Sequence, residues 1–264
     1  MSRYAAMFER LGERGEGAFG AFAMLGDPDL ATSAAILDAL AEGGADMIEV
    51  GFPFSDPVAD GPVIQAAAVR SLAAGTRTAD CFRLLAGFRA RHPDLPVGIL
   101  TYANLVAARG VEGFYRAAAE AGVDSVLVAD VPLLEAEPFL AAARAAAVAP
   151  VLIAAPNTPP ARLARIAAEG AGYTYCVARA GVTGTGGRVA FAGEIIAALR
   201  AAGAPPPVLG FGISSPEHVR LALAAGAAGA ISGSAIVELI AANPGAEAAS
   251  IGPFVAAMKS ATLP

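Results

Sequence analysis

The sequence is poor in the residues that cross-link a fold or bind a metal. It has two cysteines, Cys81 and Cys176, and two histidines in 264 residues. Two thiols cannot build the disulfide framework of a small secreted protein, and without a cluster of histidines and cysteines a metal site has no support. The sequence also has no excess of basic charge. Its net charge of −6 argues against a protein that binds nucleic acid non-specifically.

Signals for export or for a membrane span are missing as well. The first residues include charged side chains where a secretory signal would have an apolar core. The most apolar window, 222–242, is mostly alanine and glycine, contains Glu238, and is broken by a Gly-Ser pair. Such a break predicts a strand, a turn and a helix in this window rather than a membrane span. We therefore expect a soluble cytoplasmic protein.

What the chain does have is one local pattern that recurs, in which an alanine-rich helix ends at glycine and an apolar strand follows. The pattern occurs at EGGADMIEV (42–50), EAGVDSVLVAD (120–130), EGAGYTYCV (169–177) and AAGAAGAIS (224–232). Four further apolar segments are expected to form strands, at 18–25, 96–100, 150–154 and 207–211. Strands that alternate with helices indicate repeated βα units and a parallel sheet.

These eight units predict an α/β fold, a closed (βα)8 TIM barrel, and not an open dinucleotide-binding sheet. The fingerprint GxGxxG between the first strand and its helix is absent, and no flexible linker divides the chain, so residues 1–264 are expected to form one domain. Tyr4, Met7, Phe8 and Leu11 have helical spacing and predict an extra N-terminal helix. A short extra helix is expected after the eighth strand.

Two acidic residues stand where a barrel carries its chemistry. Glu49 interrupts an apolar strand, and Asp60 lies on the Pro- and Gly-rich loop that follows that strand. Working groups of such barrels come from the C-terminal ends of strands, and two carboxyls with different environments can divide acid and base roles. We expect a raised pKa for Glu49 and an ionised Asp60. The alternatives are a structural ion pair for Glu49 and an ordinary turn role for Asp60.

Late glycines predict a phosphate site. Gly212 follows the seventh strand, and Gly233 and Ser234 follow the eighth. Barrels often bind phosphate at these two loops through backbone N–H groups and a short helix. Each glycine could instead serve only to form a turn. The Gly- and Thr-rich segment after the sixth strand, about 178–189, is expected to act as a lid.

Several motifs together carry a family resemblance. They are LGDP (25–28), GFPFSDPVADGPVIQ (51–65), YANL (102–105), GVDSVLVADVP (122–132), GVTG (181–184), GFGISSPEHV (210–219) and GAISGSAIV (229–237). In this order, over nearly the whole chain, they resemble the tryptophan synthase alpha subunit family. The resemblance implies a cofactor-free lyase of tryptophan biosynthesis that cleaves indole-3-glycerol phosphate into indole and glyceraldehyde 3-phosphate.

The resemblance also implies roles for particular residues. Glu49 and Asp60 match the family's catalytic glutamate and aspartate, and Thr183 matches its lid threonine. The apolar indole pocket is matched by Phe22, Leu100, Leu127, Ala129, Ile153, Tyr175 and Phe211. The phosphate site is matched by Gly184, Gly212, Gly233 and Ser234. The sequence departs from the family at Met24, where threonine is usual, and at Ala178, where serine is more frequent.

A partner is implied too. The family works in an alpha2beta2 complex with a pyridoxal-phosphate-dependent beta subunit, and Lys259, the only lysine, is not placed to hold that cofactor. Asp56 and its loop, with the helix after YANL, are expected to face the partner. The alternative is a non-catalytic barrel that only activates a beta subunit, which the presence of both Glu49 and Asp60 disfavours. Two rival enzymatic functions are a free-standing indole-releasing lyase and a different phospho-sugar barrel enzyme.

Overall fold

A computed structural model describes residues 1–177 and 192–264. Its strands are all parallel and form one sheet. They are β1 (Ala18–Met24), β2 (Met47–Gly51), β3 (Val97–Thr101), β4 (Ser125–Val128), β5 (Ala149–Pro150), β6 (Leu152–Ala154), β7 (Thr174–Val177), β8 (Pro207–Gly210) and β9 (Gly229–Ser232). The order β5-β4-β3-β2-β1-β9-β8-β7-β6 runs around a barrel. The predicted α/β barrel is confirmed.

The barrel closes through its fifth strand, which the sequence predicts as one element at 150–154. The structure divides it at Val151 into β5, which pairs with β4, and β6, which pairs with β7. The Val151 N–H still donates to the Val126 carbonyl on β4 at 3.1 Å. β5 and β6 are therefore the two halves of one strand, which pairs with β4 through its first half and with β7 through its second half. Counted in this way, eight strands form the ring.

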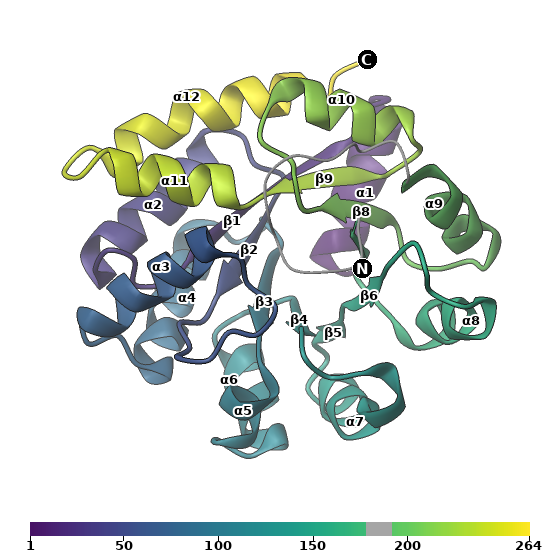
Figure 1. Ribbon diagram of the computed structural model, residues 1–264, viewed down its shortest axis with the longest axis horizontal. Helices are drawn as coiled ribbons and strands as arrows, with labels where there is room; N and C mark the ends of the chain where they lie inside the picture. Colours follow the sequence, from purple (N-terminus) through teal and green to yellow (C-terminus); the bar gives the residue numbers. More distant parts are fainter. Residues whose placement is uncertain (178–191) are drawn as a thin grey trace.

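Helices surround the strands in a ring, with α1 lying within it (Figure 1). The described elements are α1 (Arg3–Glu13), α2 (Leu30–Glu42), α3 (Pro62–Ala73), α4 (Thr78–Arg91), α5 (Ala103–Ala107), α6 (Val111–Glu120), η1 (Leu133–Glu135), α7 (Glu137–Ala145), α8 (Pro160–Glu169), α9 (Ala192–Ala201), α10 (Pro216–Ala224), α11 (Ser234–Ala242) and α12 (Glu247–Ser260). The predicted extra helices are α1 and α11. Paired helices after β2 and after β3 were not predicted. Among these helices none is long and apolar enough to span a membrane.

Side chains alternate between the two faces of each strand and so form two separate hydrophobic cores. Outward residues such as Ile48, Val50 and Ile99 pack under the helices, whereas inward residues such as Met47, Leu127 and Tyr173 fill the barrel. Strands buried on both faces read as continuous apolar runs, as parallel sheets require. Because Glu49 lies between Ile48 and Val50 in the sequence, alternation directs its side chain into the barrel.

Helix α1 closes the N-terminal end of the barrel. Its buried Tyr4, Met7 and Leu11 belong to the inner core. The Tyr4 hydroxyl hydrogen-bonds the Ser125 hydroxyl at the start of β4 at 2.9 Å, and the Tyr4 ring packs on Tyr173, with centroids 5.4 Å apart. The amphipathic spacing of this helix thus serves to plug the barrel, and the C-terminal strand ends are left as the mouth.

Candidate active site

Glu49 lies on β2, two residues before the strand ends, and is only 2% exposed. The Tyr173 hydroxyl donates a hydrogen bond to Glu49 Oε1 at 2.7 Å. Burial raises the pKa of Glu49 to about 7, the hydrogen bond from Tyr173 opposes this rise, and the charge of Asp60 adds to it. The predicted raised pKa of Glu49 is confirmed. At neutral pH this carboxyl exists in both protonation states, so it can accept a proton and return one.

Asp60 lies on the loop between β2 and α3, one residue before the N-cap Gly61, and is half-buried. Its backbone is fixed by two hydrogen bonds. The Asp60 N–H donates to the Pro57 carbonyl at 3.1 Å, and Gln65 Nε2 donates to the Asp60 carbonyl at 2.8 Å. Burial raises the pKa of Asp60, while hydrogen bonding from Tyr102 lowers it. The sequence did not anticipate this upward direction, because local polarity does not show how far the loop folds inward.

The predicted indole-pocket residues fall at the mouth and in the inner core. Phe22 on β1 is the register neighbour of Glu49, and Leu100 on β3 pairs with Leu127 on β4. Phe22, Leu127 and Tyr175 are buried in the inner core, against which Leu100, Ala129 and Phe211 pack. Ile153, the register neighbour of Tyr175, is 37% exposed. Of these apolar side chains, Phe22 is the one that the register places next to Glu49.

Gly210 explains how Tyr175 fits at the end of β7. A Cβ at position 210 would lie 2.1 Å from the Tyr175 hydroxyl oxygen and 2.2 Å from its Cζ. Phe211, next in the chain, packs edge-on against the Tyr175 ring with centroids 5.8 Å apart. Only glycine at position 210 lets this aromatic pair form one wall of the mouth.

The predicted phosphate residues lie at two neighbouring strand ends, since β8 pairs with β9. Gly212 is exposed after β8 with φ of +77°, a conformation that suits glycine. Gly233 follows β9 as the N-cap of α11, and no described side chain caps this helix. Ser234 is its first residue, so α11 begins directly after the C-terminal end of β9, and the first N–H groups of a helix are able to bind an anion. Gly184, Thr183, Ala178 and the expected lid lie outside the described residues.

An ion pair holds α3 to the loop after β1. Arg70 donates Nε and Nη2 hydrogen bonds to the two carboxylate oxygens of Asp27, both at 2.7 Å, and the Asp27 side chain is fully buried. The neighbouring Ser71 hydroxyl donates to the Leu25 carbonyl at 2.6 Å. This clasp joins the helix that starts beside Asp60 to the strand that carries Phe22.

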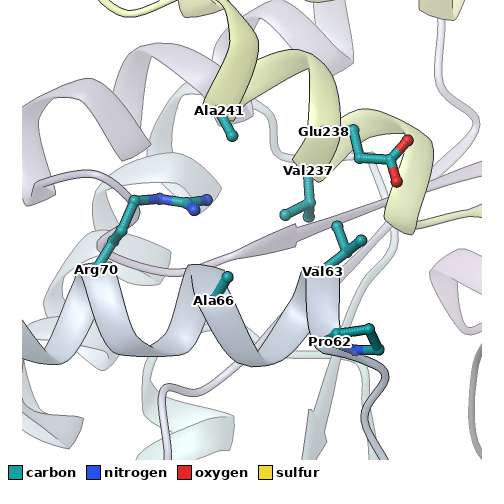
Figure 2. Close-up of a pocket in the computed structure, with 7 residues that line it drawn as sticks. All are labelled: Pro62, Val63, Ala66, Arg70, Val237, Glu238 and Ala241. Atoms are coloured by element: carbon teal, nitrogen blue, oxygen red, sulfur yellow. The ribbon is translucent and has the colours of Figure 1, made fainter.

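Arg70 also stands at one end of a shallow groove between α3 and α11 (Figure 2). The groove has a volume of about 320 Å³ and is lined by Pro62, Val63, Ala66, Arg70, Val237, Glu238 and Ala241. It runs between two helices outside the ring of strands, and Glu49 does not line it.

Sequence reasoning missed the partner of Glu49. From the sequence alone Tyr173 resembles a plain core residue, and its ring is buried, but its hydroxyl donates to the candidate catalytic carboxyl. The alternation of Tyr173 and Tyr175 on one strand face was the available signal. Asp130, which follows β4, accepts the Ala103 N–H at 2.8 Å and so joins its loop to the start of α5.

A closed parallel barrel that buries a carboxyl with a pKa near 7 at its mouth defines the class of protein. It is an α/β-barrel enzyme for acid–base chemistry. Comparisons with known proteins give the family. Residues 8–261 match the family model for the tryptophan synthase alpha chain. A tryptophan synthase alpha chain from Shewanella baltica is 54% identical over 98% of this chain and 97% of its own length, and that of Cronobacter sakazakii is 53% identical over the full length of both.

Solved structures agree. A Mycobacterium tuberculosis tryptophan synthase structure superposes with a TM-score of 0.90 at 29% identity, covering 99% of this chain and 98% of the other. A tryptophan synthase complex from Pyrococcus furiosus gives 0.85 at 33% identity, over 93% and 98%. The chain belongs to the tryptophan synthase alpha chain family, and it is accordingly a carbon–carbon lyase of tryptophan biosynthesis.

Proposed function

We propose that this chain cleaves indole-3-glycerol phosphate into indole and glyceraldehyde 3-phosphate, with Glu49 and Asp60 as its catalytic residues. The observation that carries the proposal is the Glu49 carboxyl, buried inside the barrel beside Phe22 with a pKa near 7. A carboxylate kept in such surroundings for structure alone would cost free energy without return.

The reaction is a retro-aldol cleavage that moves two protons. The indole ring carbon accepts a proton, the bond from that carbon to the glycerol chain breaks, and a glycerol hydroxyl loses its proton as the aldehyde forms. One group that changes protonation state near neutrality can serve both transfers, because general acid–base catalysis is most efficient when the pKa is close to the working pH. Glu49 meets that condition.

Asp60 takes the other role. When the ring carbon is protonated, positive charge develops on the indole nitrogen. A carboxylate that accepts the indole N–H offsets this charge in the transition state, where a pre-oriented group gives the largest benefit. Asp60 lies on the loop directly after the strand of Glu49, and the charges of the two carboxyls interact.

The remaining predicted residues bind the two ends of the substrate. Phe22, Leu100, Leu127, Ala129, Ile153, Tyr175 and Phe211 would surround the indole ring. The backbone near Gly212, Gly233 and Ser234 would bind the phosphate, together with Gly184. Thr183 would belong to a lid. These residues need no cofactor for the two proton transfers.

The test of the function is an assay of indole release from indole-3-glycerol phosphate by the purified chain, alone and with a tryptophan synthase beta subunit. We expect indole from the chain alone and faster release with the partner. Activation of the beta subunit without any indole release would instead support the non-catalytic alternative, which the retained Glu49 site disfavours.

We propose further that the partner is a beta subunit in an alpha2beta2 complex, docked on the barrel mouth. Asp56 is exposed on the β2–α3 loop, where Val58 is 70% exposed, and Leu134 of η1 is 75% exposed after β4. Exposed apolar side chains beside a carboxylate suit a protein partner. Asn104 of α5, the helix that follows β3, is exposed as well.

Asp56→Ala is expected to weaken the mutual activation of the two subunits about tenfold while leaving indole release by the free chain unchanged. Asp94→Ala is the matched control, since Asp94 is exposed at the opposite end of the barrel, before β3. Titration of activity with increasing beta subunit measures both. Equal activation curves for the two variants would place the partner elsewhere.

A further inference from the structure

Tyr102 is a buried tyrosine at the barrel mouth to which the proposed mechanism assigns no role. It follows β3 directly, is the N-cap of α5, and its ring is buried. Two contacts hold it. The N–H of the next residue, Ala103, donates to Asp130 Oδ1 at 2.8 Å, and the Tyr102 ring packs against Phe54 with centroids 5.5 Å apart.

The Tyr102 hydroxyl faces the loop that carries Asp60. The Ala59 N–H donates to the Tyr102 oxygen at 3.3 Å. Because the oxygen accepts this bond, the hydroxyl hydrogen is left for another acceptor, and the next residue supplies one. The bond to Ala59 places the Tyr102 hydroxyl beside Asp60, where the interaction of the two side chains lowers the pKa of Asp60 against the effect of burial and raises the pKa of Tyr102.

The tyrosine therefore contacts the β2–α3 loop at Phe54, Ala59 and Asp60. Within the described parts of the chain, no other side chain donates a hydrogen bond to the Asp60 carboxylate; the bond from Gln65 goes to the backbone carbonyl. A carboxylate with one donor can rotate freely when that donor is lost. Tyr102 also remains a donor at any working pH, because burial and the charge of Asp60 raise the pKa of its hydroxyl.

We propose that Tyr102 is a positioning residue that orients the Asp60 carboxylate toward the ring nitrogen of the substrate. This inference rests on the proposed role of Asp60. Asp130 and Phe54 act one step further out by fixing the tyrosine itself. The arrangement places a rigid aromatic hydroxyl, anchored to the end of β3, against a loop whose other side chains at positions 56 and 58 are exposed. Orientation of a catalytic group within a fraction of an ångström affects turnover directly.

Other titratable groups near Asp60 enter the test. In the described structure the charge of Asp60 raises the pKa of Glu49 on β2 and of Tyr175 on β7, and the charge of Asp130 after β4 raises the pKa of Tyr102. Because Glu49 titrates near neutrality, a pH profile of turnover alone would mix two carboxyls. The titration of Asp60 must be followed directly, by carbon-13 NMR of its carboxyl, with the signal assigned from its loss in Asp60→Asn.

The variant is Tyr102→Phe, which keeps the ring and removes the hydroxyl. We expect the Asp60 midpoint to move to higher pH, because a bond that favours the ionised form is gone, and kcat/KM to fall about tenfold, the usual effect of one hydrogen bond to a charged group. Tyr115→Phe is the matched control. Tyr115 is also buried, but only burial acts on its pKa. This control should leave the Asp60 midpoint and kcat/KM unchanged.

An unchanged Asp60 midpoint in Tyr102→Phe would overturn the proposal, and so would a loss of kcat/KM that Tyr115→Phe reproduces. Should Tyr102→Phe fail to fold, Asp130→Ala keeps the hydroxyl and releases its anchor. A shift of the Asp60 midpoint in the same direction supports the proposal, and none overturns it. Failure of the proposed function would show differently, as no indole release by the unaltered chain, and would leave the NMR titration interpretable.

Discussion

Replacing Glu49 with glutamine is expected to lower kcat for indole release by about 10²- to 10⁴-fold, the range that a general acid–base group contributes. Glutamine keeps the size of the side chain and can accept the hydrogen bond from Tyr173, but it cannot carry a proton. Substrate binding should therefore persist, and isothermal titration of the variant with substrate measures it. Glu120→Gln on the exposed surface of α6 is the control and should retain full activity. Full turnover by Glu49→Gln would remove Glu49 from the mechanism.

The same substitution is expected to raise stability, although it lowers activity. The folded pKa of Glu49 is raised from 4.5 to about 7, so the folded state holds this proton more tightly than the unfolded state does. Stability from this group is complete below about pH 4.5 and is lost as the pH rises through 7. The penalty at pH 8 is on the order of 3 kcal/mol, and glutamine does not carry it.

Glu49→Gln should accordingly unfold at higher urea concentration than the unaltered chain at pH 8, with a smaller difference at pH 5. Loss of activity together with a gain in stability cannot be explained by misfolding. A variant that is less stable than the parent at pH 8 would show that the ionised carboxylate is better solvated than its burial indicates.

Arg70→Met is expected to have the largest effect on stability. It removes the partner of the fully buried Asp27 carboxylate and leaves a charge without compensation, which costs about 3–5 kcal/mol. That is a large share of the total stability of an ordinary domain. Urea unfolding monitored by circular dichroism measures the change.

Two further variants make the Arg70 experiment specific. Arg144→Met breaks the exposed pair with Glu137 and should change stability by less than about 1 kcal/mol. The double variant Asp27→Asn with Arg70→Met should recover part of the loss, because no buried charge remains. A destabilisation by Arg70→Met no larger than that of Arg144→Met would mean that the clasp contributes little.

Much of this architecture could be predicted from local patterns, because each βα unit repeats the same short-range rules. A glycine stops a helix, an apolar segment forms a strand, and a carboxylate within that segment must face the barrel interior. Glu49 was found in this way. The division of the fifth strand at Val151 was not, since a change of pairing partner leaves no local mark in the sequence.

Contacts between residues far apart in the sequence could not be predicted either. Tyr173 lies 124 positions from Glu49, and Arg70 lies 43 positions from Asp27. Each residue alone resembles an ordinary core tyrosine or surface arginine. The inward fold of the Asp60 loop onto Tyr102 was missed for the same reason: its Pro and Gly content predicts turns, but not the direction in which they carry the loop.

Because helix α1 closes the N-terminal end of the barrel, it restricts how a ligand can enter and leave. Tyr4, Met7 and Leu11 fill that end, so the described barrel gives a ligand no passage there. In the proposed reaction, indole formed beside Glu49 would leave through the same mouth by which the substrate enters. A protein bound over that mouth would therefore control both substrate entry and product release. Each released indole would reach that protein first.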